Sequence, residues 1–314
     1  MKKTGKRAFR KILAIVLVCM MLLSSGAVTL AAYAVKNDSS NADTLITENI
    51  SRYEMDFNSN WKFNLGDVPT ARYKAYSDSE WRTVELPHDF SIEQDFTNSG
   101  TETESGNLPG GTGWYRKMFT LPGEIRGKRI ILNFDGAYSD TYVYVNNKYV
   151  GENHYGYNSF SFDITDYIAC NGSIVNLIAV KVVNEIPNSR WYSGSGINRD
   201  VTLTITDPVH VARYGTKVVT TETGSGASAK VTGEARATVS LQNDSEEAAN
   251  VTVGAVVLDS NGNEVSSESR TTASIPSKGT SAVSLAATVN SPKLWSVSSP
   301  NLYTMRVKVY NASN

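Results

Sequence analysis

Residues 130–151, which read IILNFDGAYSDTYVYVNNKYVG, decide the fold class of this 314-residue chain. In Ile130–Phe134 and Thr141–Val145, β-branched and aromatic residues alternate along short runs. Asp135-Gly136 ends the first run, and Asn146-Asn147 turns the second into Tyr149–Gly151. Alternation with a period of two, bounded by Gly, Asn and Asp, is typical of antiparallel strands joined by turns. The stretch therefore predicts an all-β domain.

The same pattern continues on the C-terminal side, in Ser159–Phe162, Ile174–Val183 and Val201–Thr206. No segment after residue 34 shows an amphipathic helical stripe, which excludes a parallel α/β fold. The pattern changes near Asp207-Pro208, and aromatic residues become scarce beyond it. A second series of runs follows, with a hairpin turn expected at Asn261-Gly262. Its members are Val209–Thr220, Arg236–Leu241, Val251–Leu258, Ser281–Val289 and Leu302–Val309.

About six strands in residues 208–314 fit an immunoglobulin-like sandwich, which takes about seven. We therefore expect this second domain to lack its last strand.

The first 32 residues contain six basic residues and no acidic one. Uncharged Ile12–Leu23 follows the basic start, and small residues precede a cleavage site expected near Ala32 or Ala34. This order predicts a secretory signal peptide at residues 1–32 and a secreted protein, with an uncleaved membrane anchor as the alternative. Residues 33–54 are polar and are expected to be a lead-in segment.

Residues 33–314 carry 24 basic and 31 acidic residues, a formal net charge of about −7. An acidic body argues against a nucleic-acid partner. His88, His154 and His210 are too far apart for a metal-binding motif, so we expect neither metal nor cofactor. Cys170 is the one cysteine left after removal of the signal, which excludes a disulfide scaffold.

Three motifs have structural interpretations. Gly110–Arg116 has the glycines of a phosphate loop but lacks its lysine and helix, so a turn feeding a strand is expected. His88 and Asp89 are neighbours, and neighbouring strand residues point to opposite faces, so a packed, hydrogen-bonded His88 is favoured over a dyad. Asp163–Asp166 is expected to cap a short turn.

The segment Ser189–Ile197 (SRWYSGSGI) joins two aromatic residues and an arginine to a Ser/Gly run. Such a loop recognises sugars, because an aromatic face stacks on the ring while charged groups bond the hydroxyls. The residues alone leave open whether these side chains bind sugar or only pack the end of a sandwich. For His154–Asn158 the packing role is favoured.

Taken in order, the motifs of this chain resemble the N-terminal sugar-binding domain of glycoside hydrolase family 2. The Ser189–Ile197 version is similar to secreted bacterial β-galactosidases, and Pro292–Ser296 with Pro300–Tyr303 resembles the end of the family's immunoglobulin-like second domain. Phe90, Asn147 and Asn198 depart from the family pattern. The motifs of the first domain are Leu86–Asp89, Gly113–Lys117, Phe134–Gly136, Val143–Asn146, Gly156-Tyr157 with Phe160, Phe162–Thr165, and Ser189–Ile197 with Arg199.

The resemblance implies a jelly-roll (galactose-binding-like) β-sandwich at residues 55–207, followed by the immunoglobulin-like sandwich at 208–314. It also implies a retaining glycosidase that acts on terminal β-galactosides, whose two catalytic carboxylates lie on a (β/α)₈ barrel. The chain reaches Asn314 before such a barrel, so no catalytic residue is assigned and the chain alone is expected to be inactive.

By position in the matching motifs, Asp89, Arg190 and Trp191 are the expected substrate-binding residues. Asp89 would accept sugar hydroxyls, Arg190 would orient that carboxylate or a hydroxyl, and Trp191 would wall the pocket. Replacing Asp89 or Arg190 by Ala in a longer parent is expected to weaken galactoside turnover at unchanged melting temperature.

The expected partners are a β-galactoside and the chain's own catalytic barrel, with no membrane contact after signal cleavage and possible surface attachment through further C-terminal regions. Alternatives are a free-standing carbohydrate-binding or adhesion module, and the front end of a β-glucuronidase or β-mannosidase.

Overall fold

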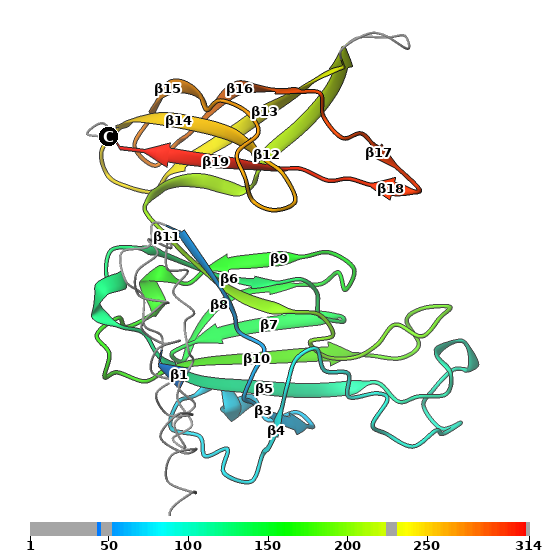
Figure 1. Ribbon diagram of the computed structural model, residues 1–314. Helices are drawn as coiled ribbons and strands as arrows, with labels where there is room; N and C mark the ends of the chain where they lie inside the picture. The colour runs from blue at the N-terminus through cyan, green and yellow to red at the C-terminus, as the bar shows by residue number, and fades with distance from the viewer. Residues whose placement is uncertain (1–42, 45–51, 224–230, 312–314) are drawn as a thin grey trace, which may run out of the picture. The chain divides into compact units, whose positions relative to one another are not determined.

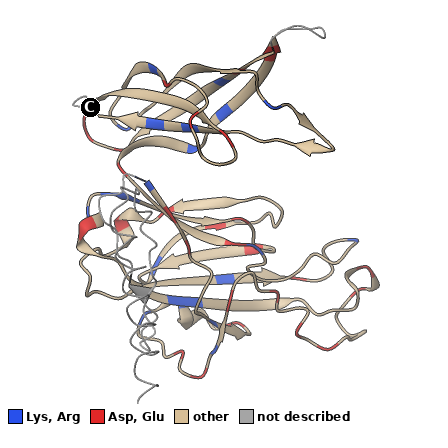
Figure 2. Ribbon diagram, in the orientation of Figure 1, with Lys and Arg blue, Asp and Glu red and all other residues tan. Residues whose placement is uncertain are grey.

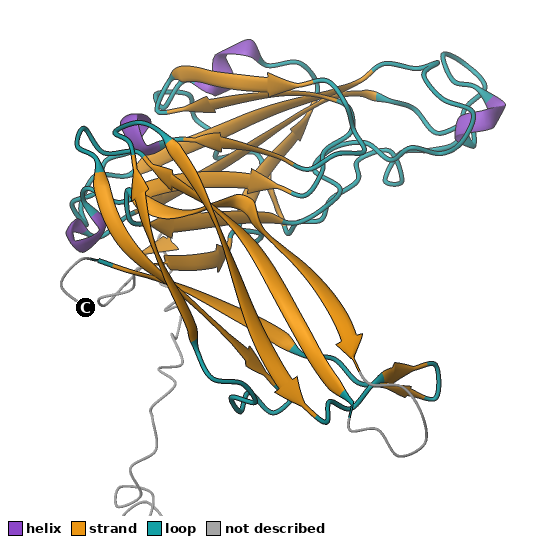
Figure 3. Ribbon diagram, turned by 90° about the horizontal axis from the view of Figure 1, so that it is seen from above, coloured by secondary structure: helices purple, strands orange, loops and turns teal. Residues whose placement is uncertain are grey.

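The computed structural model describes residues 43–44, 52–223 and 231–311 (Figure 1). The expected signal peptide and most of the expected lead-in lie outside the described residues. The described chain consists of strands, loops and four short 3₁₀ turns, with no α-helix among these residues (Figure 3). The turns are η1 (Pro69–Arg72), η2 (Thr103–Ser105), η3 (Gly123–Ile125) and η4 (Thr165–Tyr167).

The first sandwich contains two facing sheets. One has the order β4-β3-β5-β10-β7-β8, with β1 parallel to β5, and the other has the order β2-β11-β6-β9, all antiparallel. The strands are β1 (Asp43–Thr44), β2 (Arg52–Asp56), β3 (Trp61–Leu65), β4 (Arg82–Val84), β5 (Gly111–Thr120), β6 (Arg129–Phe134), β7 (Asp140–Val145), β8 (Lys148–Asn153), β9 (Phe160–Asp163), β10 (Asn176–Asn184) and β11 (Val201–Thr206).

The core between these sheets is formed by alternate residues of each strand. Along β7, Thr141, Val143 and Val145 are buried, while the residues between them are half-exposed. Val143 and Val145 share one hydrophobic cluster with Leu132 and Leu203, which come from the opposite sheet. The period-two prediction is confirmed, since β6, β7 and β8 all fall within residues 129–153.

The sandwich also reaches into the segment expected as a lead-in. β2 begins at Arg52 and pairs with β11, and β1 pairs with β5. In β2, Met55 is buried and Tyr53 packs against the core, whereas Glu54 and Asp56 are exposed. Two apolar positions among charged ones leave too weak a pattern to identify a strand from the sequence.

The motif Gly113–Lys117 of β5 is buried, including its arginine and lysine. The Nε of Arg116 donates to Asp78 Oδ2 at 2.8 Å, and its other nitrogens donate to the carbonyls of Ala71, Tyr73 and Tyr76. A buried guanidinium is stable when its donors are satisfied in this way. Arg116 therefore fastens the connection between β3 and β4, and the expectation that Gly110–Arg116 feeds a strand is confirmed.

The second sandwich also has two sheets, β12-β13-β16 and β15-β14-β19, with a separate β17-β18 hairpin. Ala237, Val239, Leu241 and Val253 form the centre of its core. The strands are β12 (Val209–Thr223), β13 (Thr232–Asn243), β14 (Ala249–Leu258), β15 (Ser269–Ile275), β16 (Thr280–Asn290), β17 (Trp295–Ser296), β18 (Ser299–Pro300) and β19 (Thr304–Tyr310).

Two details of this sandwich bear on the sequence analysis. The expected turn at Asn261-Gly262 is present between β14 and β15, with a Gly262 φ of +83° and its N–H bonded to the Asp259 carbonyl at 3.0 Å. β15 itself was not expected, because its seven residues are mostly Ser and Thr and Ile275 is the buried one.

Basic and acidic residues are interspersed along both sandwiches rather than gathered on one face (Figure 2). Within residues 43–44, 52–223 and 231–311, no helix is long and apolar enough to cross a membrane. In the same ranges, no group of three or more His, Cys, Asp or Glu side chains is placed to hold a metal ion.

Candidate functional site

Loops at one end of the first sandwich form the candidate site. The segment 195–197 bonds to the Pro87–Ser91 loop through His88 N–H to the Ile197 carbonyl (2.8 Å) and Phe90 N–H to the Ser195 carbonyl (3.0 Å). On its other side, Gly196 exchanges two backbone hydrogen bonds with Tyr138, at 2.9 and 3.0 Å. The Ser189–Ile197 motif is therefore tied into the framework like a short extra strand.

Two glycines are required for this arrangement. A Cβ on Gly196, whose φ is +106°, would lie 2.2 Å from the hydroxyl of Tyr115. A Cβ on Gly156 would lie 2.1 Å from the ring of Tyr138. Both separations are below any tolerable contact, so only glycine lets the loops close on these tyrosines.

The carboxylate of Asp89 is held at the centre of the loops. Its Oδ1 accepts the backbone N–H groups of Ser91 (2.9 Å) and Ser195 (3.0 Å), and its Oδ2 accepts the hydroxyl of Tyr192 (2.5 Å). Burial, and then the adjacent Asp89, raises the pKa of Tyr192 above its usual value, so this hydroxyl stays a donor at neutral pH. The result is an oriented hydrogen-bond acceptor in a partly solvent-accessible position.

Arg190 is exposed and makes no hydrogen bond or ion pair with another described residue. Arg190 makes no bond to Asp89 in the described structure, where the Tyr192 hydroxyl holds the carboxylate instead. The other expected role of Arg190, bonding a sugar hydroxyl, stays a prediction.

Trp191 is 58% exposed, and its Nε1 donates to the hydroxyl of Tyr157 at 2.7 Å. The structure thus brings Asp89 and Trp191 into one loop cluster, linked through Tyr192. Tyr157 and Tyr192 belong to this cluster but were not among the expected site residues. Their signal in the sequence was their place in the two aromatic loops, His154–Asn158 and Ser189–Ile197.

His88 points away from Asp89, as neighbouring positions predict. Its Nδ1 is 2.7 Å from the Tyr115 hydroxyl, and its Nε2 is 3.2 Å from Glu93 Oε1 and 3.1 Å from an Arg82 nitrogen. Burial lowers the pKa of His88 below its usual value, and the charge of Glu93 partly opposes this. A packed, hydrogen-bonded His88 is confirmed.

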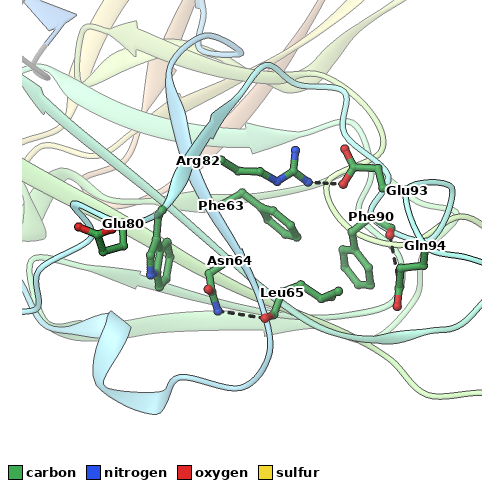
Figure 4. A pocket seen from close by; sticks show the side chains of 9 residues that line it. Phe63, Asn64, Leu65, Glu80, Arg82, Phe90, Glu93 and Gln94 are labelled. Carbon is green, nitrogen blue, oxygen red and sulfur yellow. Dashed lines mark hydrogen bonds and ion pairs between the residues drawn. The ribbon is translucent and has the colours of Figure 1, made fainter.

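On the His88 side, a cleft of about 560 Å³ opens beside β3 and β4 (Figure 4). Its volume is within the range of small-ligand sites. Its lining includes the rings of Phe63 and Phe90, which are almost fully buried, and the ion pair of Arg82 with Glu93 (Figure 4). The cleft therefore offers little aromatic face for a ligand, in contrast to the Trp191 side.

Asp163 has a structural role, as expected. Its Oδ1 accepts the N–H of Thr165 (3.0 Å) and the Thr165 hydroxyl (2.6 Å) just before η4, and its Oδ2 pairs with Arg129. The cap residue of η4 is Ile164, which makes no side-chain capping bond.

Exposed aromatic rings and a fixed carboxylate on the loops of an antiparallel sandwich are features of carbohydrate-recognising β-sandwich proteins as a class. Comparison with known families agrees. The model described as glycosyl hydrolases family 2, sugar binding domain, matches residues 55–208, and the model described as glycosyl hydrolases family 2 matches residues 209–314. The chain therefore belongs to glycoside hydrolase family 2, and it corresponds to the N-terminal region of longer family members.

Individual relatives differ in activity. The chain is 39% identical over 260 residues to the β-galactosidase BoGH2A of Bacteroides ovatus, covering 82% of this chain and 30% of that protein. It is 30% identical over 283 residues to a β-glucuronidase of Formosa agariphila, covering 83% of this chain and 28% of that protein. Among solved structures, a family 2 member from Bacteroides cellulosilyticus superposes with a TM-score of 0.77 at 35% identity, covering 83% of this chain and 34% of the other.

The chain thus spans about a third or less of the length of these relatives.

Proposed function

We propose that this chain is the N-terminal part of a secreted β-galactosidase of family 2, in which its loop cluster forms one wall of the substrate pocket. The observation that carries the proposal is the carboxylate of Asp89, held by three donors that include Tyr192, together with the exposed ring of the preceding residue, Trp191. A pyranose meets both needs of this arrangement, since its hydroxyls donate to a carboxylate and its C–H face stacks on an indole.

The chain supplies binding rather than bond cleavage. Retention requires two carboxylates about 5–5.5 Å apart, one as acid/base and one as nucleophile. Asp89 is a fixed acceptor with three donors, and Glu93 is paired with Arg82, so neither is assigned as a catalytic carboxylate. From the family resemblance we assign the catalytic pair to a barrel domain of a longer chain, and we assign the secretion signal to residues 1–32.

A β-glucuronidase is the second candidate. The observation that favours it is Arg190, whose guanidinium is exposed and unpaired among the described residues beside Trp191. An arginine in this state suits the carboxylate of a uronic acid. The β-glucuronidases among the relatives support the same reading.

The deciding experiment compares p-nitrophenyl β-galactoside with p-nitrophenyl β-glucuronide on the enzyme expressed from the full gene. We expect turnover of the galactoside, a KM raised about tenfold in Trp191→Ala and in Arg190→Ala, and an unchanged melting temperature. Arg126→Ala, an exposed arginine outside the loop cluster, serves as the control. Preferential turnover of the glucuronide would show that the enzyme is a β-glucuronidase rather than a β-galactosidase. Unchanged kinetics in both variants would show that Trp191 and Arg190 do not belong to the substrate site.

A further inference from the structure

Three exposed aromatic rings adjoin one another on two loops, with interplanar angles of 54° between Trp191 and Tyr157 and 69° between Tyr157 and Tyr155. The loop of Trp191 reaches Asp89 through Tyr192. Trp191, Tyr157 and Tyr155 are 58%, 39% and 61% exposed. The ring centres of Trp191 and Tyr157 are 6.5 Å apart, and those of Tyr157 and Tyr155 are 5.7 Å apart. A single sugar bonded to Asp89 would not need the rings of Tyr157 and Tyr155.

These rings are held in place without a ligand. The Trp191 indole N–H is bonded to the Tyr157 hydroxyl at 2.7 Å, and the ring of Tyr157 packs edge-on against Tyr138 with centres 5.3 Å apart. Asn153 Nδ2 donates to the backbone carbonyl of Tyr155 at 2.8 Å, and the Tyr155 ring packs edge-on against Tyr157. Because the rings of Trp191 and Tyr157 are already restricted, binding to them costs little conformational entropy.

The composition of the two loops favours a sugar over a protein partner. Residues 153–159 read NHYGYNS and residues 187–194 read PNSRWYSG, so neither contains Leu, Ile, Val, Met or Phe. Protein-binding surfaces combine aromatic with other apolar side chains at their centre. Here the aromatic faces are interspersed with amides, hydroxyls and one arginine, which match the hydroxyl groups around a pyranose ring.

We propose that Tyr155, Tyr157 and Trp191 form a stacking platform for sugar rings adjoining the terminal residue at Asp89. The substrate is then an oligosaccharide or a polysaccharide side chain, and the platform holds the units next to the terminal sugar. The identity of that terminal sugar rests on the proposed function, whereas the platform rests on the three rings.

The test is titration of this chain with galactose, β-1,4-galactobiose and β-1,4-galactotetraose by isothermal calorimetry. We expect the tetraose to bind at least tenfold more tightly than galactose. Tyr155→Ala and Trp191→Ala should each remove most of the gain in affinity for the tetraose. Trp295 is 61% exposed in the second sandwich, and Trp295→Ala should keep the gain. Because the replaced side chains are largely exposed, we expect the urea unfolding midpoints of the variants to equal that of the parent. Equal midpoints show that the variants are folded.

Equal affinity for galactose and the tetraose, no binding of any of the three at millimolar concentration, or an undiminished gain in both platform variants would overturn the proposal. Asp89→Asn separates it from the proposed function. If that variant binds like the parent while the platform variants lose the gain, the assignment of Asp89 to the pocket fails and the platform stands.

Discussion

The hydrogen bond between Tyr192 and Asp89 can be removed by deleting one atom, the hydroxyl oxygen of Tyr192. Tyr192→Phe deletes the donor that lies 2.5 Å from Asp89 Oδ2 and leaves the ring. A hydrogen bond to a charged group contributes about 1.5–3 kcal/mol. Because Tyr192 is 40% exposed, water replaces part of the lost bond, and we expect a loss of about 1 kcal/mol of unfolding free energy.

Asp89→Ala is a larger perturbation. It leaves the N–H groups of Ser91 and Ser195 without their acceptor, and both serines are buried. An unsatisfied buried donor costs about 1–3 kcal/mol. Because both of these bonds are only part-buried, we expect the lower part of the summed range for two donors, about 2–4 kcal/mol. The hydrogen bonds of Asp89 therefore predict a lower melting temperature for Asp89→Ala, whereas the sequence alone predicted an unchanged one. At roughly 2–4 °C per kcal/mol, the first sandwich should melt at least about 4 °C lower.

The assay is urea unfolding of the chain, followed by near-ultraviolet circular dichroism, in a double-mutant cycle. The four proteins are the parent, Tyr192→Phe, Asp89→Ala and the double variant. If the two side chains interact, the double variant is less destabilised than the sum of the singles by about 1 kcal/mol. Strict additivity, or an Asp89→Ala variant as stable as the parent, would refute the assigned role of Asp89.

Three further predictions concern the framework. Arg116→Met, which removes the donors to Asp78 and three carbonyls, should cost about 3–5 kcal/mol by urea denaturation, and a loss below 1 kcal/mol would contradict the anchoring role. Because the pKa of His88 is lowered in the folded state, the unfolded chain binds a proton first as pH falls below about 6.5, so stability is lost on acidification. His88→Gln should reduce the slope of the unfolding free energy against pH, between pH 7 and 5, by up to about 1.4 kcal/mol per pH unit. An unaltered slope would show that another group titrates. Gly156→Ala, whose Cβ would meet the Tyr138 ring at 2.1 Å, should weaken both folding and tetraose binding, whereas Gly172→Ala, a positive-φ glycine in open space, should affect folding alone.

The sequence motifs pointed to a candidate site but did not distinguish framework residues from candidate ligand contacts. Gly113–Lys117 and Ser189–Ile197 both carried the family resemblance, yet the first is buried along β5, whereas the second is exposed at 190–192 and buried at 194–197. Burial depends on which residues of other strands cover a segment. A motif of aromatic and charged residues is compatible with a buried strand and with an exposed loop, and only the positions of the other strands distinguish the two.

Strand positions were predictable wherever apolar residues alternated. β11 was found at its exact bounds, Val201–Thr206, whereas β2 and β15 were missed because charged or hydroxyl side chains occupy most of their positions. Such strands are stable because they pair with β11 and β14, which supply the hydrogen bonds and the packing surface. Their own sequence contributes little to that choice.

The sequence by itself determined the all-β class, since a period of two is a local property that each strand carries in its own residues. It also determined where flat aromatic side chains gather, in two short loops. Only the tertiary structure decided that Tyr192 rather than Arg190 orients Asp89, across 103 residues of chain, and that Tyr157 supports Trp191. A hydrogen bond depends on distance and direction in space. The backbone bonds of residues 195–197 to the His88 loop and to Tyr138 fix both for this loop.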